Sequence, residues 1–168
     1  QGGLMDNAFE FIMKNGGICS EKAYPYTGAQ GTCDDSCTKQ TTVSGHEDVP
    51  QNDEDSLRAA VAKGPVSVAI EADKTVFQFY KSGVFNNTEC GTQLDHGVLI
   101  VGYGYDYSNN IEYWKVKNSW GSQWGESGYI RMSRGYNMCG ISQSPSYPSG
   151  ARHVEGQNTK RSSIETHF

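Results

Sequence analysis

A nearly unbroken apolar run, Gly97–Tyr103, does more than any other feature to limit what this chain can fold into. A strand that is apolar at almost every position must be covered on both faces, so it belongs in the interior of a sheet. The polar stretch Asp106–Asn110 follows, and Tyr113–Asn118 then alternates between apolar and polar residues. This pattern predicts an antiparallel hairpin with a buried first strand. Val66–Ile70 and Tyr129–Met132 are predicted as further strands.

Two helices are predicted ahead of this hairpin. Apolar residues recur at helical spacing near the start of the chain: Leu4, Met5, Ala8, Phe9, Ile12 and Met13. That helix is expected to end near Asn15, because Gly16-Gly17 is a helix stop. The second helix is expected to begin near Asn52 or Asp53 and to stop at Gly64-Pro65. Helices followed by several strands predict an α+β fold.

Three other segments lack strong periodicity. Residues 18–50 are rich in turn formers and are predicted to be an ordered loop that cysteines hold in place. A short helix or turn is expected at Val76–Tyr80. Residues 149–168 are polar and aperiodic, so they are predicted to form a disordered tail. The folded domain is therefore expected to span residues 1–148.

Charge and hydropathy exclude several classes of partner. The net charge is −5, so neither nucleic acid nor an anionic membrane is an expected partner. No run approaches the roughly 20 apolar residues that cross a bilayer. The chain does not begin with methionine, and Gly2-Gly3 leads directly into a helical pattern. This beginning indicates a truncated start.

The five cysteines are an odd number, and none forms a Cys-x-x-Cys motif. In a chain of this composition they are more typical of disulfides made in an oxidising compartment than of buried thiols. One cysteine would then have its partner outside the chain. A zinc site is the alternative, built from Cys19, Cys33, Cys37 and His46, although this spacing matches no common zinc finger.

His96 is the histidine best placed for chemistry, because it stands at the mouth of the apolar strand. A side chain there is held rigidly yet can still reach a cleft. Asn118 follows the second strand of the predicted hairpin, beside Trp120. If the two strands are neighbours, the Asn118 amide can accept from one imidazole nitrogen and leave the other for a nucleophile. From pattern alone, His96 and Trp120 could equally be structural residues.

Several motifs together resemble the papain family of cysteine proteases, and their order and spacing are most similar to its cathepsin L-like branch. The resemblance runs from Gln1 to about Pro148, and the blocks around His96 and Asn118 are the most specific parts of it. The motifs are Gly2-Gly3-Leu4-Met5-Asp6, Tyr24-Pro25-Tyr26, Gly64-Pro65-Val66-Ser67-Val68, Asp95-His96-Gly97 with Val101-Gly102-Tyr103-Gly104, and Lys117-Asn118-Ser119-Trp120-Gly121 with Trp124-Gly125.

The resemblance implies a papain-like cysteine proteinase fold: the β-barrel-like right domain plus the last helix of an incomplete, helical left domain. It implies a cysteine endopeptidase in which His96 is the general base, Asn118 orients its ring and Trp120 shields their hydrogen bond. A thiolate stabilised beside an imidazolium attacks peptide carbonyls near neutral pH. No cofactor and no metal are implied.

The nucleophile itself is not recognisable in the chain. No cysteine here precedes a tryptophan, as the family's nucleophile does. Its expected position is roughly 30–35 residues before Gln1, so the isolated chain is expected to be inactive. The parent protein is expected to be lysosomal, vacuolar or extracellular and to be made with a propeptide. Its expected partners are protein or peptide substrates and protein inhibitors of cysteine proteases.

The resemblance also implies a set of substrate-binding residues. Gly2 and Gly3 are expected to pair through their backbone with an extended peptide. Asp95 is included in this set, and five neutral residues are expected to line the main specificity pocket: Leu4, Met5, Ala69, Gly97 and Ser144. A neutral pocket favours a bulky apolar or aromatic residue second before the cut bond. Pattern alone is equally compatible with Leu4, Met5 and Ala69 as core residues.

For the cysteines, the family pattern pairs Cys90 with Cys139 and gives Cys33 a partner upstream of the chain. Cys19 and Cys37 are then left over, and an additional disulfide between them is expected. Asn86-Asn87-Thr88 matches a glycosylation sequon in a predicted surface turn.

Two other functions remain open. The parent could be a non-catalytic homologue in which the cysteine is replaced and the cleft binds peptides without cutting them. It could also be a disulfide-rich secreted binding module unrelated to proteases, but that interpretation leaves the His96 and Asn118 blocks unexplained.

Overall fold

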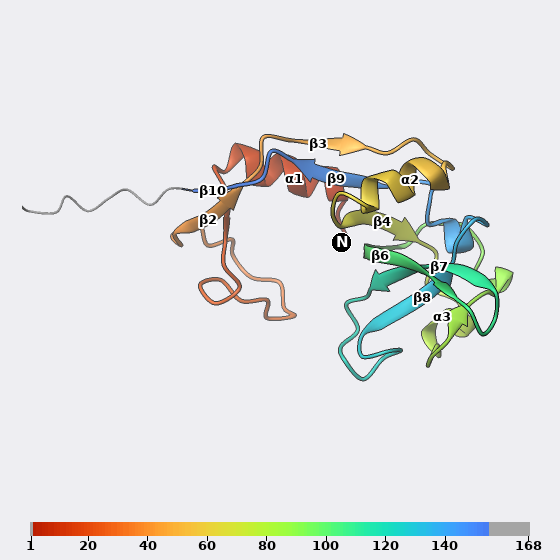
Figure 1. The fold of residues 1–168 in the computed structure, drawn as a ribbon. Coiled ribbons are helices and arrows are strands. Elements are labelled where there is room, and N and C mark those ends of the chain that lie inside the picture. The colour runs from red at the N-terminus through yellow and green to blue at the C-terminus, as the bar shows by residue number, and fades with distance from the viewer. Residues whose placement is uncertain (1, 155–168) are drawn as a thin grey trace, which may run out of the picture.

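The computed structural model describes residues 2–154, which form an α+β chain of short helices and a dominant sheet (Figure 1). The helices are α1 (Met5–Lys14), α2 (Glu54–Val61), α3 (Thr75–Gln78) and the 3₁₀ helices η1 (Thr88–Cys90) and η2 (Met138–Gly140). The strands are β1 (Ile18–Cys19), β2 (Lys39–Thr42), β3 (Gly45–Asp48), β4 (Val66–Ile70), β5 (Val84–Phe85), β6 (His96–Asp106), β7 (Ile111–Lys117), β8 (Tyr129–Ser133), β9 (Ser146–Ser149) and β10 (Arg152–His153).

The predicted hairpin is confirmed as β6 and β7, which lie at the centre of a seven-stranded sheet. The prediction that its first strand is covered on both faces is wrong for residues 2–154, because only Val98 and Ile100 on one face of the run are buried. The strand order is β3-β9-β4-β6-β7-β8-β5, and Tyr103 of β6 faces Trp114 of β7. Every neighbouring pair is antiparallel except β5 with β8. The predicted strands at Val66–Ile70 and Tyr129–Met132 are confirmed as β4 and β8. The α+β fold class is thereby confirmed for the described residues.

The core lies on this sheet and is closed by α2. Leu57 and Val61 on one face of α2 are buried, and the indole of Trp114 on β7 is fully buried. The Trp114 Nε1–H donates to Glu54 Oε2 at 2.8 Å, which ties the first turn of α2 to the sheet. The helix begins as predicted, because the Asp53 side chain caps it by accepting from the Ser56 N–H at 2.9 Å.

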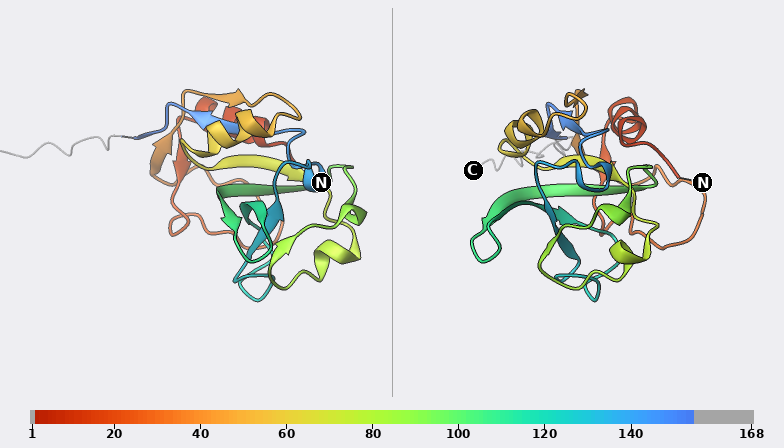
Figure 2. Two further views of the ribbon diagram at one scale, coloured as in Figure 1. Left: turned by 45° about the vertical axis from the view of Figure 1, so that its right-hand side comes forward. Right: turned by 90° about the vertical axis from the view of Figure 1, so that its right-hand side faces the viewer.

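Helix α1 differs from α2 in that none of its residues is buried. It packs beside β3 and β9, and α1 and α2 lie on either side of β9 (Figures 1 and 2). Phe11 of α1 and Leu4 just before it are exposed, whereas Met5, Phe9 and Ile12 are half-buried. The amphipathic face that the sequence predicts is therefore only partly covered within residues 2–154.

The segment 18–50, predicted as a loop, also contains three short strands. β1 pairs with β2, β2 pairs with β10, and β3 pairs with β9 over Gly45–Asp48 and Ser146–Ser149. The predicted tail therefore begins later than residue 149, because β9 ends at Ser149 and Arg152–His153 form β10. Residues 155–168 of that tail lie outside the described residues. These strands are two to four residues long, too short for a periodic signal.

The structure contains the two disulfides that were expected from the sequence. Cys19 is joined to Cys37 and Cys90 to Cys139, with Cα–Cα distances of 6.0 and 5.2 Å. Cys33 is exposed and unpaired. Within residues 2–154, no helix has the length and apolar character that crossing a membrane requires.

Candidate active site

His96 and Asn118 meet at one end of the central hairpin. His96 is the first residue of β6 and Asn118 follows the last residue of β7. Because the two strands run antiparallel, the start of one lies beside the end of the other. The His96 Nε2 and the Asn118 Oδ1 are 2.8 Å apart, a hydrogen-bond distance.

A second hydrogen bond fixes the direction of this contact. The backbone N–H of Ser119 donates to the same Asn118 Oδ1 at 2.8 Å, so that atom is the amide oxygen and acts as an acceptor. The imidazole must therefore carry its proton on Nε2. In the neutral ring Nδ1 is then the acceptor, and it has no hydrogen-bond partner among residues 2–154. The ring can take a proton from a group presented to Nδ1.

An aromatic cluster covers this pair. The Trp120 indole stacks on the His96 ring, with centroids 5.2 Å apart and an interplanar angle of 27°. Phe77 and Trp124 meet Trp120 edge-on at 5.7 and 5.2 Å. Trp120 is 39% exposed, whereas Asn118 is only 7% exposed. The indole thus covers one face of the His96 ring beside the His96–Asn118 hydrogen bond.

An open groove of about 510 Å³ adjoins the pair, between the start of α1 and strands β4, β6 and β7. Most of its walls are apolar or glycine, and Lys117 is its only charged lining residue. The lining residues are Gly3, Leu4, Met5, Ala8, Ser67, Gly97, Val98, Leu99, Lys117, Asn118 and Ser119. The groove thus contains Gly3, Leu4, Met5 and Gly97, four of the predicted substrate-binding residues.

The other predicted substrate-binding residues are placed differently. Gly2 lies in open space next to Gly3 but does not line the groove, and neither does Ala69, which pairs with Gly97 across β4 and β6. Ser144 lines a separate depression with Asp6 and Asp48. Ser144 is separated from the groove because successive residues of a helix point in different directions. Asp6, which lines the depression with Ser144, points to one side of α1, whereas Leu4, Met5 and Ala8 face the groove.

The Asp95 side chain is hydrogen-bonded to the backbone of the same chain. Its carboxylate accepts from the backbone N–H groups of Ala72 and Asp73 at 2.8 and 3.2 Å. Both oxygens are used, so Asp95 holds the chain between β4 and α3 and does not face the groove. Asp95 was expected among the substrate-binding residues because it belongs to the Asp95-His96-Gly97 motif, and the sequence could not show that the backbone amides of Ala72 and Asp73 lay within its reach.

Sequence reasoning missed two aromatic residues that contact Trp120, namely Phe77 and Trp124. It also missed six groove residues: Ala8, Ser67, Val98, Leu99, Lys117 and Ser119. Ser67 gave a usable signal, because it is a polar position in the alternating strand β4 and points away from the core. Phe77 gave none, because contact between α3 and the loop after β7 depends on the three-dimensional fold.

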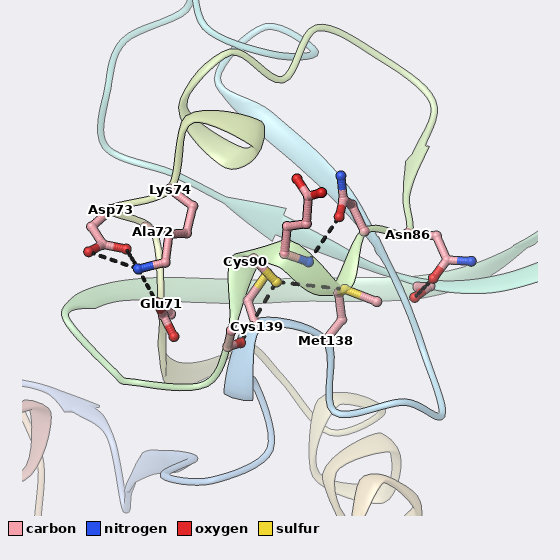
Figure 3. Close-up of a disulfide and its surroundings, with 12 residues drawn as sticks. Glu71, Ala72, Asp73, Lys74, Asn86, Cys90, Met138 and Cys139 are labelled. Carbon is pink, nitrogen blue, oxygen red and sulfur yellow. Dashed lines mark hydrogen bonds and ion pairs between the residues drawn. A yellow bond between two sulfur atoms is a disulfide. The ribbon is translucent and has the colours of Figure 1, made fainter.

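A buried carboxylate supports the loop that leads into His96. Glu71 is 3% exposed. It accepts from the Gln93 N–H and forms an ion pair with the Lys74 ammonium at 2.9 Å (Figure 3). Gly91 has φ +70°, and a Cβ there would overlap the Glu71 carboxylate. Glu71 and Asp95 therefore hold the residues 91–95 and 72–74 together from both sides.

This clamp, the contacts of the Glu71 carboxylate with Lys74 and Gln93, predicts that the stability of the fold depends on pH. The Lys74 ammonium, and after it the Gln93 N–H, lower the pKa of Glu71 below its ordinary value of 4.5. A group whose pKa is lower in the folded state stabilises the fold above its unfolded pKa, and this contribution is lost as the pH falls through the folded pKa. We expect Glu71→Gln to lower the Tm at neutral pH and the difference from wild type to narrow below pH 4.5. Thermal unfolding between pH 7 and pH 3 measures this.

The exposed neighbour Glu89 provides the matched control, because Glu89→Gln removes a charge from the adjoining 3₁₀ helix without touching the clamp. The Tm of Glu89→Gln should equal that of wild type at every pH between 7 and 3. A Glu71→Gln difference that stayed constant down to pH 3 would contradict the role of the Glu71 charge.

The cysteines give the groove no nucleophile. Four of them are in disulfides, and Cys33 lines a different depression with Tyr24 and Tyr26. The zinc alternative is wrong for this structure, because the sulfurs of Cys19 and Cys37 are bonded to each other and zinc requires thiolates.

Comparisons with known proteins identify the relatives of this arrangement. The profile of the papain family of cysteine proteases matches residues 1–149. Cysteine endopeptidase RepA of Oryza sativa subsp. japonica is 53% identical over 166 residues, covering 94% of this chain and 43% of that protein. Vignain of Ricinus communis is 57% identical over 153 residues, covering 88% of this chain and 42% of that protein.

Solved structures have the same fold. Bromelain from Ananas comosus, in complex with an inhibitor, has a TM-score of 0.83 and 48% identity, over 88% of this chain and 70% of that chain. Digestive procathepsin L 3 of Tenebrio molitor larval midgut has a TM-score of 0.80 and 50% identity, over 88% of this chain and 49% of that chain. The chain spans less than half the length of the curated relatives it matches. On these matches and this fold, the chain belongs to the papain family of cysteine proteases.

Proposed function

We propose that this chain carries the histidine and asparagine of a cysteine endopeptidase whose nucleophile comes from a segment outside residues 1–168. The 2.8 Å contact between His96 Nε2 and Asn118 Oδ1 is the observation that carries this proposal. It leaves Nδ1 as the acceptor, on a residue whose neighbour Gly97 and partner Asn118 both line the groove. A thiol presented to Nδ1 can lose its proton there.

The proposed reaction uses the imidazole twice. Nδ1 takes the thiol proton, and the thiolate attacks the peptide carbonyl carbon. The imidazolium then gives that proton to the leaving amine, and a thioester remains. Water, deprotonated by the same Nδ1, attacks the thioester and releases the acid and the thiol. Asn118 holds the ring in one orientation throughout and adds no countercharge of its own.

The groove supports a preference for a bulky apolar or aromatic residue second before the cut bond. Leu4, Met5 and Ala8 form its wall on the side of α1, and Val98 and Leu99 lie on the side of β6. Its lining residues include no carboxylate that could pair with an arginine or lysine of the substrate. Protein or peptide substrates fit such a groove, and protein inhibitors that fill it are the further proposed partners.

We propose a lysosomal, vacuolar or extracellular location for the same protein. The two disulfides support it, because such bonds persist in oxidising compartments and are rare in the cytosol.

The deciding experiment extends the chain by about 40 residues upstream of Gln1, as the parent transcript encodes them. That longer protein is incubated with a thiol-directed peptide inhibitor, and the labelled residue is located by mass spectrometry. We expect the label on a cysteine that precedes a tryptophan. Peptide substrates with phenylalanine at the second position before the cut should be cleaved faster than those with arginine.

Changing the labelled cysteine to alanine is the control and should abolish both labelling and cleavage. A serine or glycine in that upstream position, with no labelling, would instead make the protein a peptide-binding homologue. A label found only on Cys33 would contradict the proposed assignment as well.

A further inference from the structure

The sequence Asn86-Asn87-Thr88 is the one match to the Asn-x-Ser/Thr sequon among the 168 residues, and the proposed peptidase function makes no use of it. It lies between the end of β5 and the start of η1. Transfer of a glycan to such a sequon needs an accessible asparagine amide and the hydroxyl of the third residue. The structure shows whether the folded chain can carry a glycan on this asparagine.

The Asn86 side chain is turned so that its amide nitrogen is free. Asn86 is exposed, and its Oδ1 accepts from the buried Ser133 Oγ at 3.3 Å. In Figure 3 the oxygen points along this bond and the nitrogen points the opposite way. Among residues 2–154, Nδ2 has no hydrogen-bond partner. A glycan on Nδ2 would therefore extend outward without breaking the bond to Ser133.

The other two sequon residues suit the same role. Thr88 is exposed, and its hydroxyl has no hydrogen-bond partner in the described part of the chain. Asn87 uses its own side chain to cap η1, accepting from the Glu89 N–H at 2.9 Å. The middle position of a sequon can be any residue except proline. The capping contact of Asn87 therefore does not interfere with glycosylation of Asn86.

The surroundings leave room for a glycan. β5 is the edge strand of the seven-stranded sheet, and β8 and β7 lie between it and β6. None of the three sequon residues lines the groove beside His96. A bulky polar group at the end of β5 would also shield an exposed sheet edge from pairing with another chain.

We propose that Asn86 is an N-glycosylation site. In the transfer, a bond forms between Nδ2 and the anomeric carbon of an oligosaccharide carried on a lipid diphosphate. The bond from that carbon to the diphosphate oxygen breaks, Nδ2 loses one proton, and the lipid diphosphate leaves. The proposal requires entry into the secretory pathway, which the two disulfides support. It does not depend on the groove cutting peptides.

A cell-free test separates the sequon from folding. Residues 1–168, preceded by a secretion signal, are translated with endoplasmic-reticulum microsomes, and the protease-protected chain is treated with peptide-N-glycosidase. We expect the wild-type chain to shift to lower mass on this treatment and Thr88→Ala to show no shift. Thr88→Ser keeps the hydroxyl and should keep the shift.

Two results would overturn the proposal. One is a protected wild-type chain whose mass the glycosidase leaves unchanged. The other is a Thr88→Ala chain that still shifts, because the glycan would then be elsewhere. Since transfer takes place on the entering chain, neither result depends on whether a variant reaches the native fold.

Discussion

Replacing His96 with alanine is expected to lower kcat/KM by at least about 10⁴-fold in the longer protein that includes the nucleophile. The imidazole is the group that Asn118 orients and Trp120 covers. Without it, no base takes the thiol proton and no acid protonates the leaving amine. Single-turnover hydrolysis of a fluorogenic peptide, measured alongside thermal unfolding, separates this chemical loss from a loss of structure.

His153→Ala is the matched control, because His153 is exposed on the short strand β10 and its Nδ1 lies 3.3 Å from the Gln40 carbonyl oxygen, away from the His96–Asn118 pair. Its kcat/KM should equal that of wild type. A His96→Ala enzyme that kept more than about one hundredth of wild-type activity would show that another group serves as the base.

The second large effect concerns stability. The disulfide between Cys90 and Cys139 closes a loop across 49 positions and joins η1 to η2. Loop-closure entropy for that length is worth about 4 kcal/mol. We expect Cys90→Ser with Cys139→Ser to reduce the free energy of unfolding by about this amount, or to lower the Tm by roughly 10 °C. Denaturant unfolding without reductant measures the change.

Cys33→Ser is the natural comparison, because Cys33 is exposed and makes no disulfide. That substitution should leave the free energy of unfolding within about 0.5 kcal/mol of wild type. If the double serine variant also fell within this range, the cross-link would be an incidental contact and not a support of the loop before His96.

The central sheet could be predicted from sequence because its signal is local. β6 carries a nearly unbroken apolar run although only its Val98 and Ile100 are buried within residues 2–154, and β7 alternates because only one of its faces is covered. The pairing of His96 with Asn118 followed from these two strands and from the family motifs. Asp53 ahead of α2 was predictable for the same reason, since a cap acts within one turn.

The missed features all depend on partners far away in the chain. β2 and β3 have neither an apolar run nor a strict alternation; β2 is a strand through its pairing with β1 and β10, and β3 through its pairing with β9. Ser144 was assigned to the groove by its place in the family pattern, but α1 separates it from Leu4 and Met5. Asp95 shows a third case, in which a polar residue beside a histidine serves the backbone instead of the substrate.

The pairing of β3 with β9 also determines when this end of the sheet can form during synthesis on the ribosome. The Tyr147 hydroxyl donates to Glu47, a residue 100 positions earlier. At a synthesis rate of 5–20 residues per second, roughly 5–20 s pass before the partner of β3 is made. Until then β3 is an unpaired edge beside an uncovered helix. Native structure at this end of the sheet can therefore form only after almost the whole described chain has been translated, and contacts of such long sequence separation make folding slow.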